Sequence, residues 1–345
     1  MPPALRSAPR SPLTTAVLPL VVLGLLAAVP FTVSPYLQDL VVRILIFAIF
    51  ALSLELLVGT TGLVSLGHAA FLGIGAYATV LAAPATDPGS FFGLLALAMV
   101  SAGIYAAVTG ALSLRTKGVY FIMVTLAFAQ MAYFIVHDTK AGGGSDGIYL
   151  NIKPVLGPAA APWLDLQDRT TFYFVVLVAF ALVYAVLALL LRSRFGHALV
   201  GIRLNEQRMR AAGFPTFFYK WAAFVIAGML AAVAGFLIAV RDGFVNPEML
   251  AWHESGAVLI MLILGGLGHL RGAVLGAVAF TLLKEACQSQ GIVGGLADHW
   301  QLTLGVTIIV LVAAMPKGLI GLPDLFRRRP APARTVDGEV DPDGA

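Results

Sequence analysis

Apolar runs of about 20 residues recur along most of the chain, and this feature limits the possible folds more than any other. Hydrophobic residues account for 59% of the 345 positions and charged residues for 12%, whereas soluble domains carry roughly 25% charged residues. A water-soluble fold of this length has too little interior to bury that much apolar surface. Because helices satisfy their own backbone hydrogen bonds in lipid, the sequence predicts an all-α polytopic membrane protein.

Ten apolar segments are predicted as transmembrane helices, and several are short or interrupted by glycine. They cover residues 13–33, 40–58, 64–83, 91–113, 119–136, 171–191, 221–240, 256–268, 272–288 and 300–316. The first follows Arg6 and Arg10 as in a signal peptide, but it is too long for such a leader and is predicted as a retained helix. The segment 256–268 ends in LGGLGHLRG, which indicates either a discontinuous helix beside a solute pathway or close helix packing.

Charged residues between these segments predict which side of the membrane each connection faces. With the amino terminus in the cytoplasm, the connection that carries Arg115 is also inside, and the acid-containing loop 137–170 is outside. The chain then divides into a cytoplasmic segment 1–12, a transmembrane domain 13–322 and a proline-rich cytoplasmic tail 323–345 that is expected to be disordered. Both termini are therefore predicted to be cytoplasmic.

The connection 192–220 is a highly charged segment between two apolar runs. It holds six basic residues and one acidic residue, Glu206. Glu206 lies three residues after Arg203 and four before Arg210, so it is placed for ion pairs along one helix. Apolar residues recur in the same segment at helical spacing, namely Ala198, Leu199, Ile202 and Met209.

Gly213 and Pro215 are typical helix-ending residues, so the pattern predicts one short amphipathic helix over 197–213 at the cytoplasmic surface. Its apolar stripe is expected either to rest on lipid head groups or to insert into a groove of another protein. A membrane protein that is driven by a separate ATPase needs such a docking helix, because the conformational change of the soluble ATPase must be transmitted to the transmembrane helices.

Seven motifs follow one another along the chain. The longest reads ALVGIRLNEQRMRAAGF and, after four further residues, YKWAAFVIAGMLAAVAG. The others are VGTTGLVSLGHAAFLGIGAYATVLA, TKGVYFIMVTLAFAQM, GGSDGI, SRFGHAL, MLILGGLGHLRGAVLGA and PKGLIGL. Together these motifs resemble the Liv-type branched-chain amino acid ABC permeases, most closely the M-type subunit, over nearly all of residues 38–322.

The resemblance implies a membrane subunit of an ABC importer in the bacterial cytoplasmic (inner) membrane. Such a permease pairs with a second, similar permease subunit, docks on two cytoplasmic ABC ATPases and receives its solute from an extracytoplasmic binding protein. The residues that the resemblance assigns to ATPase docking are Ile202, Arg203, Asn205, Glu206, Ala211 and Gly213. A heterodimer is expected, with a homodimer as the alternative.

Three positions depart from the family pattern, and two of them, Glu55 and Gln130, leave the solute open. Leu204 stands where the family often has an acid, Gln130 where it often has Glu, and Glu55 where it often has Asn. Branched-chain amino acids are the first expectation, and urea, amides or another small solute are the alternative.

Candidate pathway residues are polar or glycine positions in or beside the apolar runs, namely Glu55, Ser65, His68, Thr125, Gln130, Gly265 and Gly266. An ionisable side chain costs roughly 2.5–3.5 kcal/mol at the bilayer centre, so such groups usually face the protein interior. Glu55 is expected to be a hydrogen-bond partner near the inner interface or a pathway group, and Gln130 to join two helices. Arg43, Lys284 and Glu285 lie near outer helix ends, where their charges can reach the interface.

Other classes of function find little support in the residues. The chain has no GxxxxGK[ST] loop, no metal-ligand spacing and a single cysteine, Cys287, so no cofactor, metal or enzymatic activity is predicted. The net charge of +4 does not predict nucleic-acid binding, because the cytoplasmic loops of membrane proteins usually carry an excess of Lys and Arg. An ion-coupled secondary transporter or a channel is the alternative from a different class, because backbone carbonyls can hold a coupling ion.

Two weaker patterns add expectations. KAGGGSDGI (140–148) resembles a phosphate cradle, but no helix with a lysine follows it, so it is predicted as a flexible turn that meets a delivery protein. The stretches 66–81 and 267–282 share Leu-Gly-His, Gly-Ala and a final Leu. This similarity indicates either an internal repeat or chance agreement between helices rich in glycine and alanine.

Overall fold

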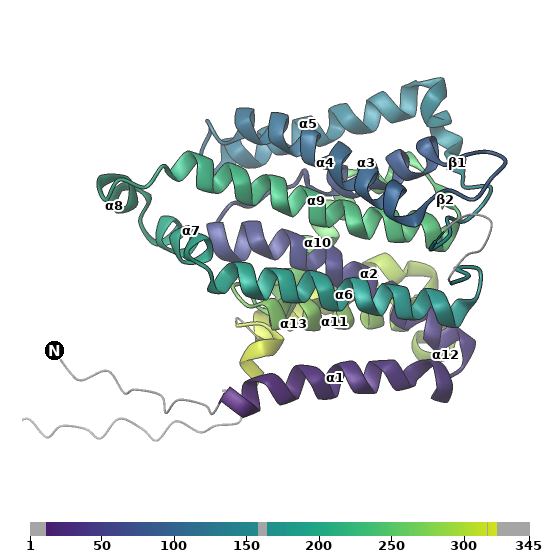
Figure 1. The fold of residues 1–345 in the computed structure, drawn as a ribbon. Coiled ribbons are helices and arrows are strands. Elements are labelled where there is room, and N and C mark those ends of the chain that lie inside the picture. Colours follow the sequence, from purple (N-terminus) through teal and green to yellow (C-terminus); the bar gives the residue numbers. More distant parts are fainter. Residues whose placement is uncertain (1–11, 158–163, 316, 323–345) are drawn as a thin grey trace, which may run out of the picture.

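The computed structural model describes residues 12–157, 164–315 and 317–322, so most of the predicted amino-terminal segment and the whole predicted tail lie outside the described residues. The described chain is a bundle of helices with one two-stranded sheet (Figure 1). The prediction of an all-α polytopic membrane fold is confirmed, with this small sheet as an addition.

The longer helices follow the predicted segments closely. They are α1 (Pro12–Thr32), α2 (Pro35–Glu55), α4 (Phe91–Ser113), α5 (Val119–Asp138), α6 (Arg169–Arg192), α9 (Thr216–Asp242) and α11 (Leu270–Gln288). The shorter ones are α3 (His68–Ala82), α7 (Arg194–Leu204), α8 (Glu206–Ala211), α10 (Trp252–Gly265), α12 (Gln290–Val293) and α13 (Trp300–Ala314). A π-helical turn, Leu56–Thr61, continues α2, and strands β1 (Ile148–Tyr149) and β2 (Phe244–Val245) pair antiparallel.

The predicted count of ten spans is not confirmed. Six stretches of the described chain are long and apolar enough to cross a membrane, or seven if α10 and α11 count as one. Helix α3 has 15 residues and is therefore about 22 Å long, shorter than the roughly 30 Å hydrocarbon core. Helices α10 and α11 are bent by 115° at the glycine-rich break between them, so they form a broken span or a re-entrant loop.

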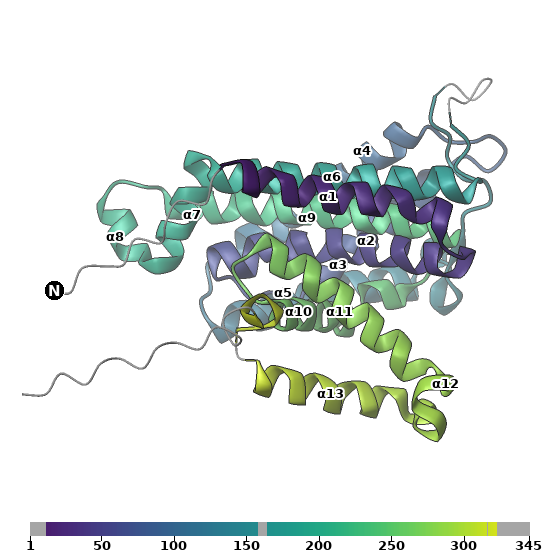
Figure 2. The ribbon, with the colours of Figure 1, turned by 90° about the horizontal axis from the view of Figure 1, so that it is seen from below.

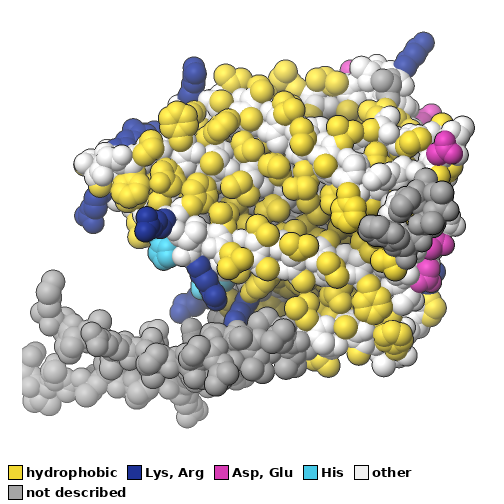
Figure 3. Space-filling view, viewed as in Figure 1, with side chains coloured by type: hydrophobic (Ala, Val, Ile, Leu, Met, Phe, Trp, Pro, Cys, Tyr) yellow, Lys and Arg dark blue, Asp and Glu magenta, His cyan; other side chains and the backbone are white. Residues whose placement is uncertain are grey.

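Helices α2 and α9 form the centre of the bundle. Helices α3 and α4 pack on α9, while α2 lies between α6 and α11 (Figure 2). Most side chains of α2 and α9 are buried, whereas α4, α5, α6 and α13 expose many large apolar side chains. These exposed side chains give the outer surface an apolar character (Figure 3), as a surface in contact with lipid requires.

Helix ends follow local residue chemistry. The side chains of Ser90 and Asp168 accept hydrogen bonds from Gly93 N at 3.4 Å and Thr171 N at 2.9 Å, which caps the amino ends of α4 and α6. Gly243 ends α9 with φ +64°, a left-handed conformation that favours glycine. The stretches 66–81 and 267–282 also behave alike, because each Leu-Gly-His precedes or begins a helix, α3 or α11. An internal repeat and chance agreement both remain as alternatives.

Residues 140–149 form regular structure where the sequence predicts a flexible turn. Residues 140–146 form two 3-10 turns, and β1 pairs through Ile148 with Val245 of β2. Gly147 has φ +72°, and a Cβ there would lie 2.2 Å from the Val245 carbonyl oxygen. The glycine run therefore serves a tight backbone contact that ties this loop to the end of α9.

Helices α3 and α9 approach each other through small residues. A Cβ at Gly235 would lie 1.9 Å from the Leu72 carbonyl oxygen, and one at Gly75 would lie 2.7 Å from the backbone of Ala232. Dispersion contacts between closely packed backbones stabilise helix pairs in a membrane, where apolar side chains gain nothing by leaving lipid.

We predict that Gly235→Ala lowers the melting temperature of the purified protein, because overpacking against a backbone carbonyl costs about 1–3 kcal/mol. Gly93→Ala is the matched control, since its Cβ would meet only Ser90 at 3.5 Å on an exposed helix turn. If the Gly235→Ala protein were as stable as the Gly93→Ala protein, the close approach of α3 and α9 would not contribute to the stability of the bundle.

Candidate functional site

The connection 192–220 projects from one end of the bundle as α7 and α8, which we call the α7–α8 hairpin (residues 193–215; Figure 1). The predicted single helix over 197–213 is wrong, because the chain breaks at Asn205, whose backbone is extended (φ −158°, ψ 97°). The Asn205 side chain accepts a hydrogen bond from the Arg208 backbone N–H at 2.9 Å and so caps α8. Asparagine favours this capping role over a helix interior.

The apolar stripe of the hairpin faces its own bundle. Ala198, Leu199 and Ile202 are buried, and the Met209 side chain covers Gly201. The stripe is therefore used to hold α7 in place and is not free to rest on lipid or to enter a partner's groove, contrary to the prediction. The exposed surface of the hairpin includes Leu204, Asn205, Gln207, Arg208, Ala211, Ala212 and Gly213.

Glu206 ties the hairpin to the start of α9. Its Oε1 accepts hydrogen bonds from Arg210 Nη2 at 2.6 Å, Lys220 Nζ at 2.9 Å and Thr216 Oγ1 at 3.1 Å. The predicted ion pair with Arg210 is confirmed, whereas the one with Arg203 is wrong, because Arg203 points elsewhere. Lys220 and Thr216 are buried, so the network has a rigid base.

The network also sets the charge of the Glu206 carboxylate. Partial burial alone would raise its pKa, but the hydrogen bond and charge of Lys220, with hydrogen bonds from Arg210 and Thr216, lower the pKa to about 2. Because the folded pKa lies below the ordinary value of 4.5, the contribution of Glu206 to stability is present above about pH 4.5 and is lost as the pH falls towards 2. At neutral pH the network is fully formed.

Arg203 connects the hairpin with the end of α2. Its Nη1 donates a hydrogen bond to the backbone carbonyl of Gly59, in the π-helical turn that follows α2. Carbonyl groups at a helix end lack partners within the helix and carry partial negative charge, so a guanidinium stabilises them. Gly62 ends the turn with φ +75° and leaves room for the Arg203 side chain, whose Cγ lies 3.3 Å from where a Cβ would stand.

Glu55 connects the same end of α2 with the break between α10 and α11. It is 2% exposed, and its Oε1 accepts a hydrogen bond from the Gly268 backbone N–H at 2.8 Å. Gly59 lies one turn further on, and any Cβ there would collide with the Glu55 carboxylate, only 1.8 Å away. Contacts therefore run without interruption from the hairpin through Gly59 and Glu55 to Gly268.

Three further candidate pathway residues lie in packed surroundings. Ser65 and Thr125 share a space of about 10 Å³, close to the size of one water molecule and far too small for a solute. His68 is fully buried, with Nε2 2.8 Å from Ser53 Oγ and its ring stacked on Phe50. In this conformation these residues pack the protein interior.

The remaining candidates behave differently from one another. Gly265 allows α10 to meet α11, because a Cβ there would lie 1.9 Å from the Gly272 carbonyl oxygen, and Gly266 has φ +111° in the break itself. Close packing and a broken helix, offered as alternatives by the sequence, therefore occur together. Gln130 is half-buried and makes no hydrogen bond within the part of the chain that the structure describes, so its role in joining helices stays a prediction.

The residues that sequence analysis missed are backbone partners. Gly59 and Gly268 supply the carbonyl and the N–H that Arg203 and Glu55 bind. A signal for this was present, because each glycine lies at or just beyond the end of a predicted span, 40–58 or 256–268, but nothing local pairs them with those two side chains.

We predict that Lys220→Met loosens the hairpin without unfolding the bundle, because it removes a partly buried, charge-assisted hydrogen bond worth about 1.5–3 kcal/mol. Amide hydrogen exchange of residues 205–213 at pH 7 should become roughly tenfold faster or more. Arg208→Met is the matched control, since the Arg208 side chain is exposed and forms no ion pair among the described residues. Equal protection in both variants would mean that Glu206 does not anchor the hairpin.

Comparison with known proteins agrees with this architecture. A family profile described as "Branched-chain amino acid transport system / permease component" matches residues 36–315. The high-affinity branched-chain amino acid transport system permease protein LivM of Escherichia coli (strain K12) is 31% identical, over 86% of this chain and 73% of its own length. LivM of Salmonella typhimurium is 30% identical, over 84% of this chain and 71% of its own length.

A more distant relative is the L-arabinose transport system permease protein AraH of Escherichia coli, 26% identical over 50% of this chain and 51% of its own length. The family match spans most of the chain, and family membership decides against an ion-coupled transporter or a channel. The chain belongs to the family of branched-chain amino acid transport system permease components, and it is a multi-pass inner-membrane subunit of an ABC transporter that works with ATPase and binding-protein partners and is not itself an enzyme.

Proposed function

We propose that this permease passes leucine, isoleucine and valine, or closely related amino acids, from a binding protein into the cytoplasm. The proposal for the solute is supported by the names of the two LivM relatives, which match over most of both chains. The relative named for L-arabinose matches over half of the chain and at lower identity, which favours an amino acid over a sugar. No observation favours urea or amides.

The observation that carries the proposed mechanism is the line of contacts from the hairpin to the α10–α11 break. Arg203 binds the Gly59 carbonyl, and Glu55 binds the Gly268 N–H. A displacement of the hairpin is therefore transmitted to the break between α10 and α11. A small change in the backbone angles at this break moves both helices. We infer that nucleotide-driven movement of the ATPases switches this break between two packed arrangements.

We further propose that the hairpin is the cytoplasmic docking element for one of two ATPase subunits, and that a second, similar permease completes a heterodimer. Charge distribution supports this orientation, since Arg and Lys side chains gather at the hairpin end and most acidic side chains at the other (Figure 3). The same argument makes both termini cytoplasmic and residues 13–322 the permease domain.

Leu204 is the residue best placed to enter an ATPase surface. It is 81% exposed, more than any other large hydrophobic residue in the described part of the chain. A hollow of about 510 Å³ lies next to it, lined by parts of residues 61–64, 114–122 and 202–206. Of the predicted docking residues, Asn205, Ala211 and Gly213 are exposed beside it, whereas Ile202 is buried and can only position the hairpin.

We predict that Leu204→Cys, treated with a short thiol-reactive crosslinker, captures an ATPase subunit in the assembled transporter. The native Cys287 is buried and should not compete. Leu302→Cys on α13 is the control, because Leu302 is 67% exposed and lies outside the hairpin. Capture from position 302 but not from 204 would contradict docking on the hairpin.

Gly213→Arg and Glu206→Lys are expected to abolish uptake and ATPase copurification while membrane insertion persists. Gly213 has φ +86° and no neighbouring atom within 4 Å, so an arginine there strains the backbone locally and adds bulk and charge to the exposed surface. Gly294→Arg is the matched control, since Gly294 also has a positive φ, +60°, and no neighbouring atoms. Uptake that survives both hairpin changes would rule out the docking role.

The solute is tested by uptake into proteoliposomes that contain this chain and its partner subunits. Leucine uptake should require ATP and the binding protein, and excess isoleucine or valine should compete while L-arabinose and urea should not. Leucine uptake driven by an ion gradient without the ATPases would contradict the proposal.

A further inference from the structure

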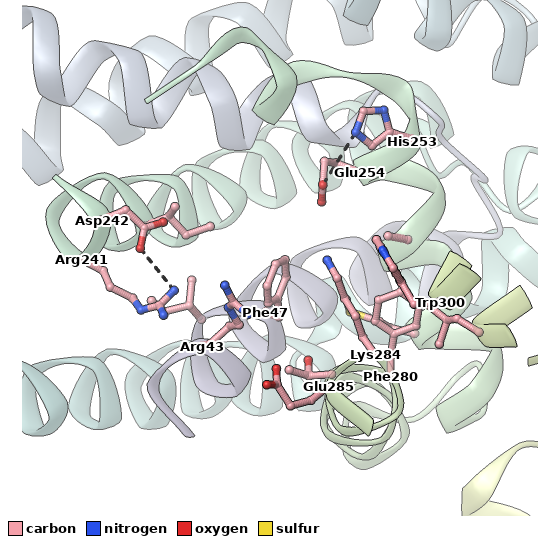
Figure 4. A pocket seen from close by; sticks show the side chains of 16 residues that line it. Arg43, Phe47, Arg241, Asp242, His253, Glu254, Phe280, Lys284, Glu285 and Trp300 are labelled. Atoms are coloured by element: carbon pink, nitrogen blue, oxygen red, sulfur yellow. Dashed lines mark ion pairs between the residues drawn. The ribbon is translucent and has the colours of Figure 1, made fainter. Parts of the chain in front are cut away.

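A cavity of about 270 Å³ lies between α2, α9, α10, α11 and α13, away from the hairpin end (Figure 4). Its volume is close to the lower limit of roughly 300 Å³ for pockets that hold drug-sized ligands, so it suits a smaller solute. Apolar side chains line part of the wall, among them Phe47, Met261, Phe280 and Leu304.

Charged side chains of both signs line the same cavity without neutralising one another. Arg43 of α2 and Lys284 of α11 are half-buried, and neither forms an ion pair with an acidic residue of the described chain. Lys284 instead lies 5.6 Å from the centre of the Trp300 ring. In Figure 4 the side chains of Arg43 and Lys284 point into the space towards which Glu254 also points.

The acidic groups are likewise left without strong cationic partners. Glu254 has only His253, at 3.9 Å, and Glu285 accepts a hydrogen bond from the Tyr36 hydroxyl. Arg241, a third cation at the cavity, is shared by two acids, Asp39 at 2.6 Å and Asp242 at 3.3 Å, whose negative charge Arg43 also faces without an ion pair. Arg43, Lys284, Glu254 and Glu285 therefore line the cavity without an Arg–carboxylate or Lys–carboxylate ion pair among the described residues.

An unsatisfied hydroxyl points to the same conclusion independently. Thr281 lines the cavity, is 4% exposed, and its Oγ1 has no hydrogen-bond partner among the described residues. Threonine in a helix often bonds back to a carbonyl one turn earlier, as Thr79 does with Gly75 at 2.7 Å. The hydroxyls of Tyr77 and Ser113 are also buried without a partner among the described residues, but of these three hydroxyls only that of Thr281 lines this cavity, where a ligand could reach it.

We propose that this cavity binds the zwitterionic head of an apolar α-amino acid on its way through the permease. Arg43 and Lys284 hold the carboxylate, Glu254 holds the ammonium group while Glu285 adds negative charge to the cavity wall, and the aromatic and aliphatic wall receives the side chain. This inference rests on the proposed function, which supplies an amino acid as the solute, and adds the site within this chain that holds it.

The charge pattern excludes other classes of solute by simple electrostatics. An anion would lie beside Glu254 and Glu285, and a cation beside Arg43 and Lys284, so each would meet repulsion as well as attraction. A sugar or urea would leave four charges unpaired in a site partly withdrawn from water. A zwitterion with an apolar side chain places its carboxylate near the cationic residues, its ammonium group near the acidic residues and its side chain against the apolar wall.

The first test measures leucine uptake and ATP hydrolysis by the assembled transporter with Arg43→Gln or Glu254→Gln. Each variant should lose about tenfold or more of its leucine uptake rate at low solute, because a hydrogen bond to a charged group is lost. ATP hydrolysis stimulated by the binding protein should stay within about twofold, and Arg43→Lys should restore most of the uptake. Arg169→Gln, an exposed arginine near the same end at the start of α6, is the control and should transport normally.

The second test keeps all four charges. Ala257→Cys places a thiol on the cavity wall, and leucine should protect it from a thiol reagent added outside, whereas leucinamide and L-arabinose should not. Vesicles of phosphatidylglycerol alone are used, because a zwitterionic lipid head group carries the same pair of charges. Protection that appears only with phosphatidylethanolamine would assign the cavity to lipid and overturn the proposal.

The outcomes separate this inference from the proposed function. Normal uptake by both Gln variants, parallel loss of uptake and ATP hydrolysis, or absence of leucine protection at position 257 would each overturn the cavity assignment while leaving leucine import intact. A wild-type transporter that fails to take up leucine would reject the proposed solute, and the inference with it.

Discussion

Lipid cannot form hydrogen bonds with a protein backbone, and this constraint governs where the helices of this permease are interrupted. The π-helical turn after α2 leaves the Gly59 carbonyl to be bound by Arg203, and the break after α10 leaves the Gly268 N–H to be bound by Glu55. Each interruption therefore carries a charged side chain from another part of the chain. For Glu55, which is buried, the cost of leaving water is offset in part by the backbone N–H that it binds.

The same requirement couples the hairpin to the membrane part. Arg203 belongs to the exposed hairpin, but its hydrogen bond lies at the end of the most buried helix. Glu206 fixes the other half of the hairpin to α9 through Lys220. The hairpin is thus attached to both central helices, α2 and α9, so a force on the hairpin reaches the core of the bundle. The close glycine contacts between α10 and α11 leave little free space, so a displacement there must move the helices.

Much of the fold could be predicted because the relevant signals are local. Helix α4 coincides with its predicted range, and α5, α6 and α9 differ by a few residues at their ends. The errors have physical causes: Asn205 caps a helix where periodicity suggested continuity, and α3 is apolar but too short to span. The β1–β2 pairing escaped prediction because two-residue strands form only through a partner nearly one hundred positions away, Val245 for Ile148.

The sequence by itself determined that this chain is a membrane protein, where most of its helices lie, and to which family it belongs, because apolar length, capping residues and motif order are properties of neighbouring residues. It also identified the hairpin as the unusual segment. Only the tertiary structure decided what each charged residue binds. Arg203 and Gly59 are 144 positions apart, Glu55 and Gly268 are 213 apart, and Arg43 meets Glu254 and Lys284 only around a shared cavity. A charge buried in an apolar medium takes its partner from whatever folding brings near, and that proximity is a property of the packed bundle.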